Sequence, residues 1–207
     1  MRPRFVLALF IATFVAASSQ AVTTRFDRFD KNHSTIGFRV PILRGLSEVW
    51  GKFTDFSATI VWDEADPTKS SVDARIVVAS VDTGIPERDE DLRSAHFFEV
   101  EKFPEIGFHS TSIEKRPAGL VAKGELSMHG VTKSVELPFE IVGLDEDAKT
   151  KKISLGVRAT ITLDRDDFGI TWRHDYPPFV GEQVAIEIHL LTRLTERGAA
   201  APSQPTP

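Results

Sequence analysis

Histidines and clustered carboxylates are the residues of this chain whose side chains could bind a metal ion or transfer a proton. The histidines are spread along the whole sequence: His33, His96, His109, His129, His174 and His189. No two show the His-x-x-x-His spacing that places two metal ligands on one helix face. The sequence also lacks cysteine, so no thiolate is available. The pattern predicts no metal site and favours histidines that satisfy backbone groups at strand ends.

Signals for catalysis are equally weak. No Gly-x-Ser-x-Gly motif for a nucleophilic serine occurs. Asp164, Asp166 and Asp167 surround Arg165 near a predicted turn, where an acid–base pair is conceivable but solvated turn residues are favoured. We therefore predict a non-enzymatic protein with no catalytic residues. A hydrolase with an unrecognised site is the weakest of the alternatives.

Three cations are candidates for contact with an anionic headgroup: Arg88, Lys133 and Arg165. The planar guanidinium of arginine matches the oxygens of a phosphate. The competing interpretation is favoured for each of them. Arg88 then forms an ion pair or cap that holds a short helix, and the other two are solvated.

The N-terminal segment predicts where the protein works. Arg2 and Arg4 precede an almost wholly apolar run over residues 5–17, and small residues stand at Ser19 and Ala21. This order is typical of a secretory signal peptide, and the apolar run is short of the ~20 residues that span a bilayer. We expect cleavage after Ala21 and a periplasmic or secreted protein without a stable membrane anchor. An uncleaved anchor is the less favoured alternative.

Bulk composition narrows the class further. Removing residues 1–21 from the 207 leaves 186, enough for one large domain, and takes the net charge from −5 to −7 because two arginines are lost. Such an acidic chain is a poor partner for nucleic acid. Fifteen Phe against one Tyr indicate a large apolar interior that needs few hydrogen-bond partners.

The remaining sequence reads as strands, because apolar residues alternate with polar ones. Eight runs show this period: 36–40, 49–62, 72–79, 106–113, 120–129, 133–142, 153–163 and 183–194. Residues 83–95 break it and predict one short helix, with Pro86 at an early position and acidic residues in the first turn. We expect the domain to cover residues 22–194 and residues 195–207 to form a disordered tail.

An open sheet of about eight strands has edge strands with unpaired backbone groups, which invite aggregation. Closure of the sheet into a barrel removes these edges. A barrel of that size can hold one small ligand. We therefore predict an all-β fold, an extended antiparallel β-barrel of about eight strands with an apolar lumen and one short helix. A two-sheet sandwich remains an alternative that alternation does not exclude.

A series of short motifs runs in order through the chain. They lie at residues 30–38, 49–53, 63–67, 80–84, 88–94, 97–100, 103–108, 110–111, 124–133 and 165–170. Each is weak alone, but the ordered set resembles the YceI-like family of secreted, lipocalin-shaped, polyisoprenoid-binding proteins. The resemblance covers about residues 27–192 and implies a lipocalin-like barrel, an isoprenoid-like chain in its lumen, and often a dimer.

The sequence departs from the family pattern in two places. The family often carries His two places after the residue that matches Val40, where this chain has Ile42. Any part that this His plays in ligand choice is therefore in doubt here. The segment 172–178 is also unusual, and we expect it to reshape one rim of the barrel.

A lipid chain needs a dry tunnel, because each buried CH₂ contributes roughly 0.8 kcal/mol. The predicted lumen contacts are Phe38, Val40, Val49, Phe53, Leu126, Met128, Phe139, Ile141 and Trp172. Side chains that simply fill a core are the competing interpretation for each of them.

We predict a carrier of an amphipathic long-chain lipid, such as an isoprenoid quinone precursor or a prenyl phosphate, that uses no cofactor and no metal. A homodimer is compatible with the resemblance. The alternative is a stress-protective or interaction protein with a side-chain-filled barrel and a partner-binding outer face. The two differ in whether the barrel is hollow.

Overall fold

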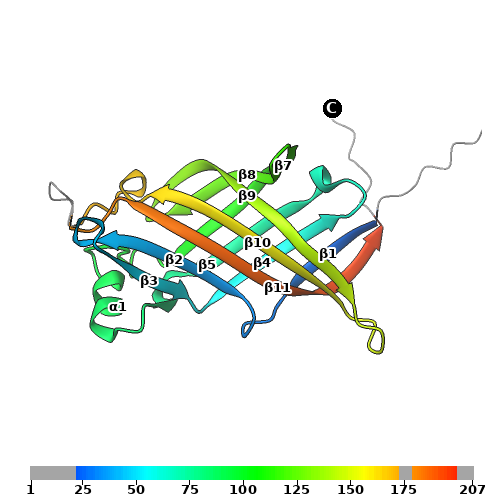
Figure 1. Ribbon diagram of the computed structural model, residues 1–207, viewed down its shortest axis with the longest axis horizontal. Helices are drawn as coiled ribbons and strands as arrows, with labels where there is room; N and C mark the ends of the chain where they lie inside the picture. The colour runs from blue at the N-terminus through cyan, green and yellow to red at the C-terminus, as the bar shows by residue number, and fades with distance from the viewer. Residues whose placement is uncertain (1–21, 173–178, 200–207) are drawn as a thin grey trace, which may run out of the picture.

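The computed structural model describes residues 22–172 and 179–199 (Figure 1). Its strands and its α-helix follow in this order: β1 (Val22–Phe29), β2 (Thr35–Ile42), β3 (Ser47–Phe53), β4 (Phe56–Asp63), β5 (Ser71–Val77), β6 (Val81–Asp82), α1 (Pro86–Arg93), β7 (Glu105–Arg116), β8 (Gly119–Met128), β9 (Val131–Glu146), β10 (Ile153–Asp164) and β11 (Gln183–Ala199). No helix in the described ranges is long and apolar enough to cross a membrane.

The sheet closes on itself. β1 pairs with β4 on one side and with β11 on the other, which completes an eight-stranded antiparallel ring in the order β1-β4-β5-β7-β8-β9-β10-β11. β2, β3 and β6 extend the wall at one end. The predicted closed barrel is confirmed, and the sandwich is not what forms.

Two long wall strands are broken in the middle. β11 pairs with β2 through residues 185–189 and with β1 through residues 192–199, so β1 and β2 follow one another along the same edge. The break between them is held by Leu191, whose carbonyl accepts from the Asp30 amide at 2.9 Å and whose amide donates to the Ser34 hydroxyl at 3.0 Å. The predicted single run over 49–62 likewise divides into β3 and β4, with the Thr54 amide donating to the Ser80 carbonyl at 3.1 Å in the gap.

The two ends of the barrel differ. α1, the β2–β3 hairpin and the connection from β10 to β11 lie together at the left end in Figure 1. Near the other end, apolar side chains from β1, β4 and β10 pack into a cluster that is at most 7% exposed. Its members are Phe26, Ile60, Trp62, Ile153 and Leu155. This packed cluster closes the far end of the barrel.

The strand assignment differs from the sequence prediction at both ends of the domain. β1 was missed, and β11 runs to Ala199, so the disordered tail expected from residue 195 is wrong for residues 195–199. The two errors have one cause, because these segments pair with each other, as Val22 does with Ala199 and Thr24 with Arg197. Neither segment alternates regularly, so only its partner reveals it. Residues 1–21 and 200–207, where the signal peptide and the rest of the tail are predicted, lie outside the described residues.

The short helix predicted within 83–95 is present as α1, with Pro86 at its start. The residue before it, Ile85, gives no side-chain cap. Instead the Asp89 carboxylate turns back and accepts hydrogen bonds from the Thr83 amide (2.8 Å) and hydroxyl (2.5 Å). This contact ties the first turn of α1 to the end of β6.

Candidate functional site

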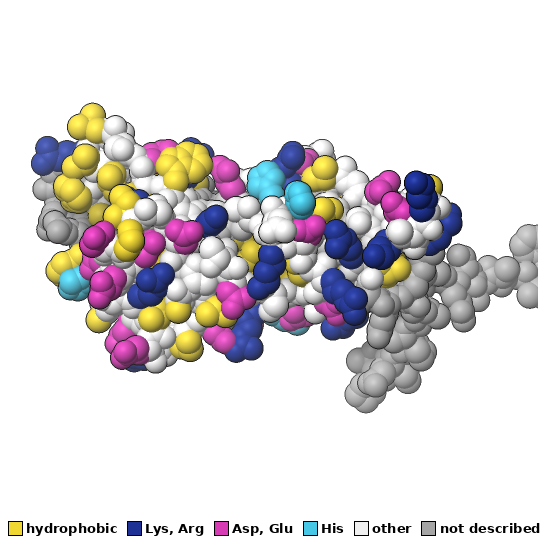
Figure 2. All heavy atoms as spheres, turned by 90° about the horizontal axis from the view of Figure 1, so that it is seen from below, with side chains coloured by type: hydrophobic (Ala, Val, Ile, Leu, Met, Phe, Trp, Pro, Cys, Tyr) yellow, Lys and Arg dark blue, Asp and Glu magenta, His cyan; other side chains and the backbone are white. Residues whose placement is uncertain are grey.

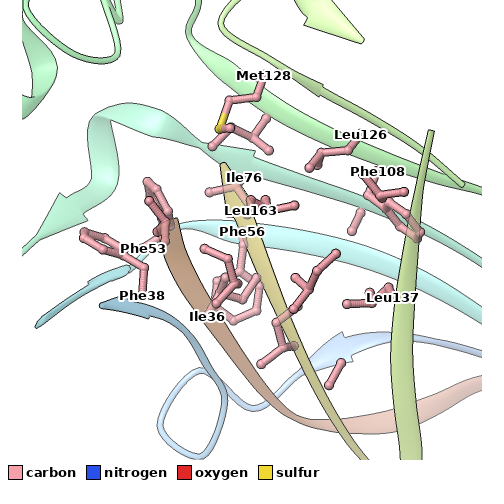
Figure 3. Close-up of a pocket in the computed structure, with 18 of the residues that line it drawn as sticks. Ile36, Phe38, Phe53, Phe56, Ile76, Phe108, Leu126, Met128, Leu137 and Leu163 are labelled. Carbon is pink, nitrogen blue, oxygen red and sulfur yellow. The ribbon is translucent and has the colours of Figure 1, made fainter. Parts of the chain in front are cut away.

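A cavity of about 450 Å³ occupies the inside of the barrel. Small-molecule sites commonly measure about 300–1,000 Å³, so the space is of ligand size. Side chains from most strands point into it, as Figure 3 shows for residues such as Phe56, Phe108 and Leu163. Polar residues are few in the described part of its lining: Ser70, Arg88, Asp91 and Arg165. The wall is therefore almost entirely hydrocarbon.

β9 shows how the sequence produces a hollow rather than a filled core. Along this strand Val135, Leu137 and Phe139 line the cavity, and each is only half-buried between exposed neighbours. Inward-pointing residues of a filled barrel would be fully buried against one another. Their remaining exposed surface faces the cavity, so the barrel is not packed solid here.

Two glycines let aromatic rings lie against the wall. A Cβ added at Gly51 of β3 would overlap the ring of Phe38, its cross-strand neighbour on β2. A Cβ at Gly124 of β8 would lie 2.7 Å from the ring of Phe108 on β7. Glycine at both positions lets the rings cover the backbone, which keeps them out of the middle of the lumen. Both glycines lie in the family-like motifs, but sequence reasoning gave them no role.

All nine residues predicted to contact the ligand line this cavity. They are Phe38, Val40, Val49, Phe53, Leu126, Met128, Phe139, Ile141 and Trp172. The eight that lie on strands share one parity within each of β2, β3, β8 and β9, as the alternation of inward and outward positions requires, and Trp172 lies beyond the end of β10. Their contact with a bound lipid stays a prediction.

The cavity reaches the surface beside α1. Trp172 and Phe179 both line it, yet they are 41% and 43% exposed, so they form part of its mouth. The Trp172 ring stacks on the His96 ring at a centroid distance of 4.0 Å, and His96 Nδ1 lies 2.7 Å from Asp91 Oδ1. These contacts fix the Trp172 side chain against the segment that follows α1. The predicted reshaping of a rim by residues 172–178 falls on residues 173–178, which lie outside the described residues.

Arg165 is part of the wall and not a free cation. It is 5% exposed and donates from Nε to the Gly181 carbonyl at 3.0 Å, from Nη2 to the Val180 carbonyl at 3.2 Å, and from Nη1 to the Ile170 carbonyl. Burial lowers the pKa of its guanidinium from the ordinary arginine value. Its contacts hold the connection between β10 and β11 in place, which positions one side of the mouth.

The other two candidate cations, Lys133 and Arg88, differ in their position relative to the cavity. Lys133 does not line the cavity and instead pairs with Asp167 at the surface. Arg88 lines the cavity and is half-buried, donating from Nε to the Thr83 hydroxyl (2.8 Å) and from Nη2 to the Thr83 carbonyl (3.0 Å). The favoured helix-holding role is therefore present for Arg88. Among the described residues Arg88 Nη1 has no hydrogen-bond partner, so this nitrogen can donate to a ligand.

Within the described residues, no group of three or more potential ligands could hold a metal ion. His129 Nδ1 lies 3.0 Å from the Phe168 carbonyl, the kind of backbone contact that the sequence predicted for histidines near strand ends. His109 pairs with Asp73 on the surface at 2.5 Å, and this hydrogen bond raises the pKa of His109. Neither arrangement is a catalytic pair facing the cavity.

Comparison with known proteins supplies the family. The model of the YceI-like domain matches residues 28–191. The chain belongs to the YceI-like family. Protein YceI of Salmonella arizonae is 36% identical to it over 168 residues, which cover 80% of this chain and 86% of that protein. The predicted resemblance is confirmed.

Solved structures agree with the barrel of this YceI-like protein. The Campylobacter jejuni YceI protein superposes with a TM-score of 0.67 and 28% identity, covering 73% of this chain and 88% of that one. A polyisoprenoid binding domain from Saccharophagus degradans, implicated in plant cell wall breakdown, superposes with a TM-score of 0.57 and 14% identity, covering 85% and 99%. At that identity the second likeness shows the fold alone.

The family-like motifs also acquire physical roles in the YceI-like barrel. Residues 80–84 and 88–94 contain Thr83, Arg88 and Asp89, which together anchor α1 beside the mouth. Residues 165–170 contain Arg165 and one of the carbonyls that it binds. These three motifs therefore lie at the elements that shape the open end.

Proposed function

We propose that this YceI-like protein binds and carries an amphipathic long-chain lipid, with the apolar chain inside the barrel. The observation that carries the proposal is the apolar cavity of about 450 Å³, open beside α1 and closed at the far end by the packed cluster around Phe26 and Leu155. A blind apolar tunnel fits a molecule with one long tail and one polar end. The polyisoprenoid binding named for the Saccharophagus degradans domain supports a prenyl chain as the tail.

Apolar enclosure supplies enough free energy for such a role. Burial of ten CH₂ groups contributes roughly 8 kcal/mol before the cost of ordering the chain is subtracted. We propose carriage without catalysis and without a cofactor, and the small number of polar residues among the described lining supports this. The predicted periplasmic or secreted location and the homodimer belong to the same proposal.

The polar end of the ligand belongs at the mouth. Arg88 lines the cavity there and keeps Nη1 for a ligand oxygen, while Asp91 lies one helical turn further along α1. An isoprenoid quinone precursor, through its phenolic oxygen, or a prenyl phosphate can accept a hydrogen bond from Arg88. Asp91 disfavours a fully charged phosphate by like-charge repulsion, so the quinone precursor is the better fit.

The proposal is tested on protein purified without delipidation. Organic extraction and native mass spectrometry should find a co-purifying lipid, and delipidated protein should bind geranylgeraniol added as a probe. Absence of any bound lipid, together with no binding of the probe, would contradict the proposal. The Arg88→Gln variant should keep most of its affinity for the alcohol probe and lose more affinity for geranylgeranyl phosphate if Arg88 contacts the headgroup.

The alternative predicted from sequence required a barrel filled by its own side chains. The cavity argues against a filled barrel, because the inward-pointing residues of β9 retain exposed surface.

A further inference from the structure

Large apolar side chains surround the mouth of the cavity on the outside. We call Leu43, Leu46, Ile85, Trp172 and Phe179 the mouth rim; they are 42%, 86%, 46%, 41% and 43% exposed. Figure 2 shows hydrophobic side chains gathered at the left end of the molecule, which carries α1 and the β2–β3 hairpin in Figure 1, and Lys and Arg side chains toward the other end. Exposed apolar residues that gather in one place mark an interaction surface.

Backbone contacts make the rim continuous with the cavity. The Leu43 amide donates to the Phe179 carbonyl at 2.9 Å, and Ile42 pairs with Val180 as an isolated bridge. The hairpin tip and the β10–β11 connection therefore lie side by side. Ile42, Phe179 and Val180 also line the cavity, so the outer apolar surface continues into the tunnel wall at this side of the mouth.

The hairpin tip has an uncommon conformation that displays its leucines. Leu43 and Arg44 have φ values of 52° and 62°, a region that non-glycine residues seldom occupy, before Gly45 at 85°. Such residues persist where the surrounding structure enforces them, and they occur often at functional sites. Leu46, directly after this tip, is 86% exposed and does not line the cavity. Neither leucine contributes to the core, so folding does not explain them.

We propose that the mouth rim docks on the surface of a neutral lipid bilayer, so that cargo passes between the bilayer and the barrel without crossing water. The inference rests on the proposed function, because a long-chain lipid is dissolved in membranes and not in water. Leucine, phenylalanine and tryptophan on one exposed face are the residues that enter the boundary between headgroups and acyl chains.

Charge favours a neutral surface over an anionic one. Without residues 1–21 the chain carries a net charge of −7, so bulk attraction to anionic headgroups is absent. Contact with the bilayer must then come from apolar burial, which salt does not screen. We expect binding to phosphatidylcholine vesicles to be insensitive to ionic strength and not to increase when phosphatidylserine is added.

The test compares two glutamate substitutions at exposed apolar positions. Leu46→Glu changes the mouth rim. Val142→Glu is the matched control, because Val142 is an exposed apolar residue (58%) that does not belong to the mouth rim. It lies eleven residues after the first residue of β9, which is about 36 Å along the strand. The protein used starts at Val22, because contacts among residues 22–199 close the barrel and pack its far end. Circular dichroism and thermal unfolding confirm that each variant is folded.

Flotation with phosphatidylcholine vesicles measures the partition coefficient. We expect Leu46→Glu to lower the partition coefficient at least about ten-fold, because a leucine that enters the bilayer is replaced by a charge. Val142→Glu should leave the partition coefficient unchanged. The inference is overturned if the unmodified protein does not float with vesicles, or if both variants float equally. Loss of self-association in Leu46→Glu, measured by analytical ultracentrifugation, without flotation of the parent would instead identify the rim as a contact between two copies.

A second measurement separates this inference from the proposed function. The fluorescent probe 1-N-phenylnaphthylamine is titrated into each protein without vesicles. Leu46→Glu should bind it as the parent does, because Leu46 does not line the cavity. If the probe binds but vesicles do not, only membrane docking fails. If vesicles bind and neither this probe nor a prenyl alcohol enters, the proposed lipid carriage fails.

Discussion

Filling the tunnel from within is the most direct perturbation of the proposed function. Val135 is the fifth residue of β9, lines the cavity and is half-buried. Val135→Phe places a ring in that space with no new hydrogen-bonding group to satisfy. An aromatic residue is also well suited to a strand, so the backbone of β9 should be retained.

The magnitude follows from the atoms added. Phenylalanine carries about four more side-chain carbons than valine, and each ligand CH₂ that they displace contributes roughly 0.8 kcal/mol. The expected loss is therefore about 3 kcal/mol of binding free energy, or roughly a hundred-fold in Kd. The free protein should lose little stability, because the ring occupies existing space.

The assay is a titration of delipidated protein with a fluorescent prenyl probe, together with thermal unfolding of each variant. Val142→Phe is the matched control, since it is the same substitution on the same strand at a position that is 58% exposed and outside the cavity. Equal affinity in Val135→Phe, Val142→Phe and the parent, with all three folded, would refute a ligand inside the barrel.

Three further predictions concern the frame of the barrel and its outer surface. Gly51→Ala should destabilise the protein by about 1–3 kcal/mol in urea unfolding, because the new methyl group displaces the Phe38 ring. Arg165→Met should cost about 3 kcal/mol or more, because three carbonyls lose their donor. By NMR, Glu136 should titrate near a pKa of about 2, because both of its oxygens accept from Arg116 at 2.7 Å. Since pairing lowers this pKa, the contribution of the pair to stability is present at neutral pH and is lost as pH falls from about 4.5 through about 2.

Each of these has a control within the chain. Gly143→Ala meets no atom within 4 Å and should change stability by less than about 0.5 kcal/mol, and an equal effect at both glycines would exclude the ring contact as the cause. Lys133→Met removes only an exposed ion pair and should cost less than about 1 kcal/mol. Arg116→Ala should return the pKa of Glu136 toward its ordinary value, and an unchanged pKa would contradict the assigned cause.

Local alternation was enough to group most of the lumen residues by face. Along strands such as β8 and β9 every second side chain points to the same face, so parity groups Leu126 with Met128 and Phe139 with Ile141. Which of the two faces lines the lumen was decided by the register of the folded sheet. The roles of the candidate cations could not be separated in this way. Arg165 and Arg88 differ in what surrounds them in space, and their carbonyl and hydroxyl partners belong partly to segments that meet only after folding.

The sequence by itself determined the strand character, the all-β class, the position of the helix and the apolar face of each strand. These follow from periodicity and turn chemistry, which act over a few residues. The tertiary structure alone decided that the lumen is hollow, that one end is plugged and the other open, and that β1 exists at all. A hollow is the space left between eight strands, and β1 is stabilised by pairing with residues up to 177 positions away, as Val22 is with Ala199. Such long-range relations leave no local pattern to read.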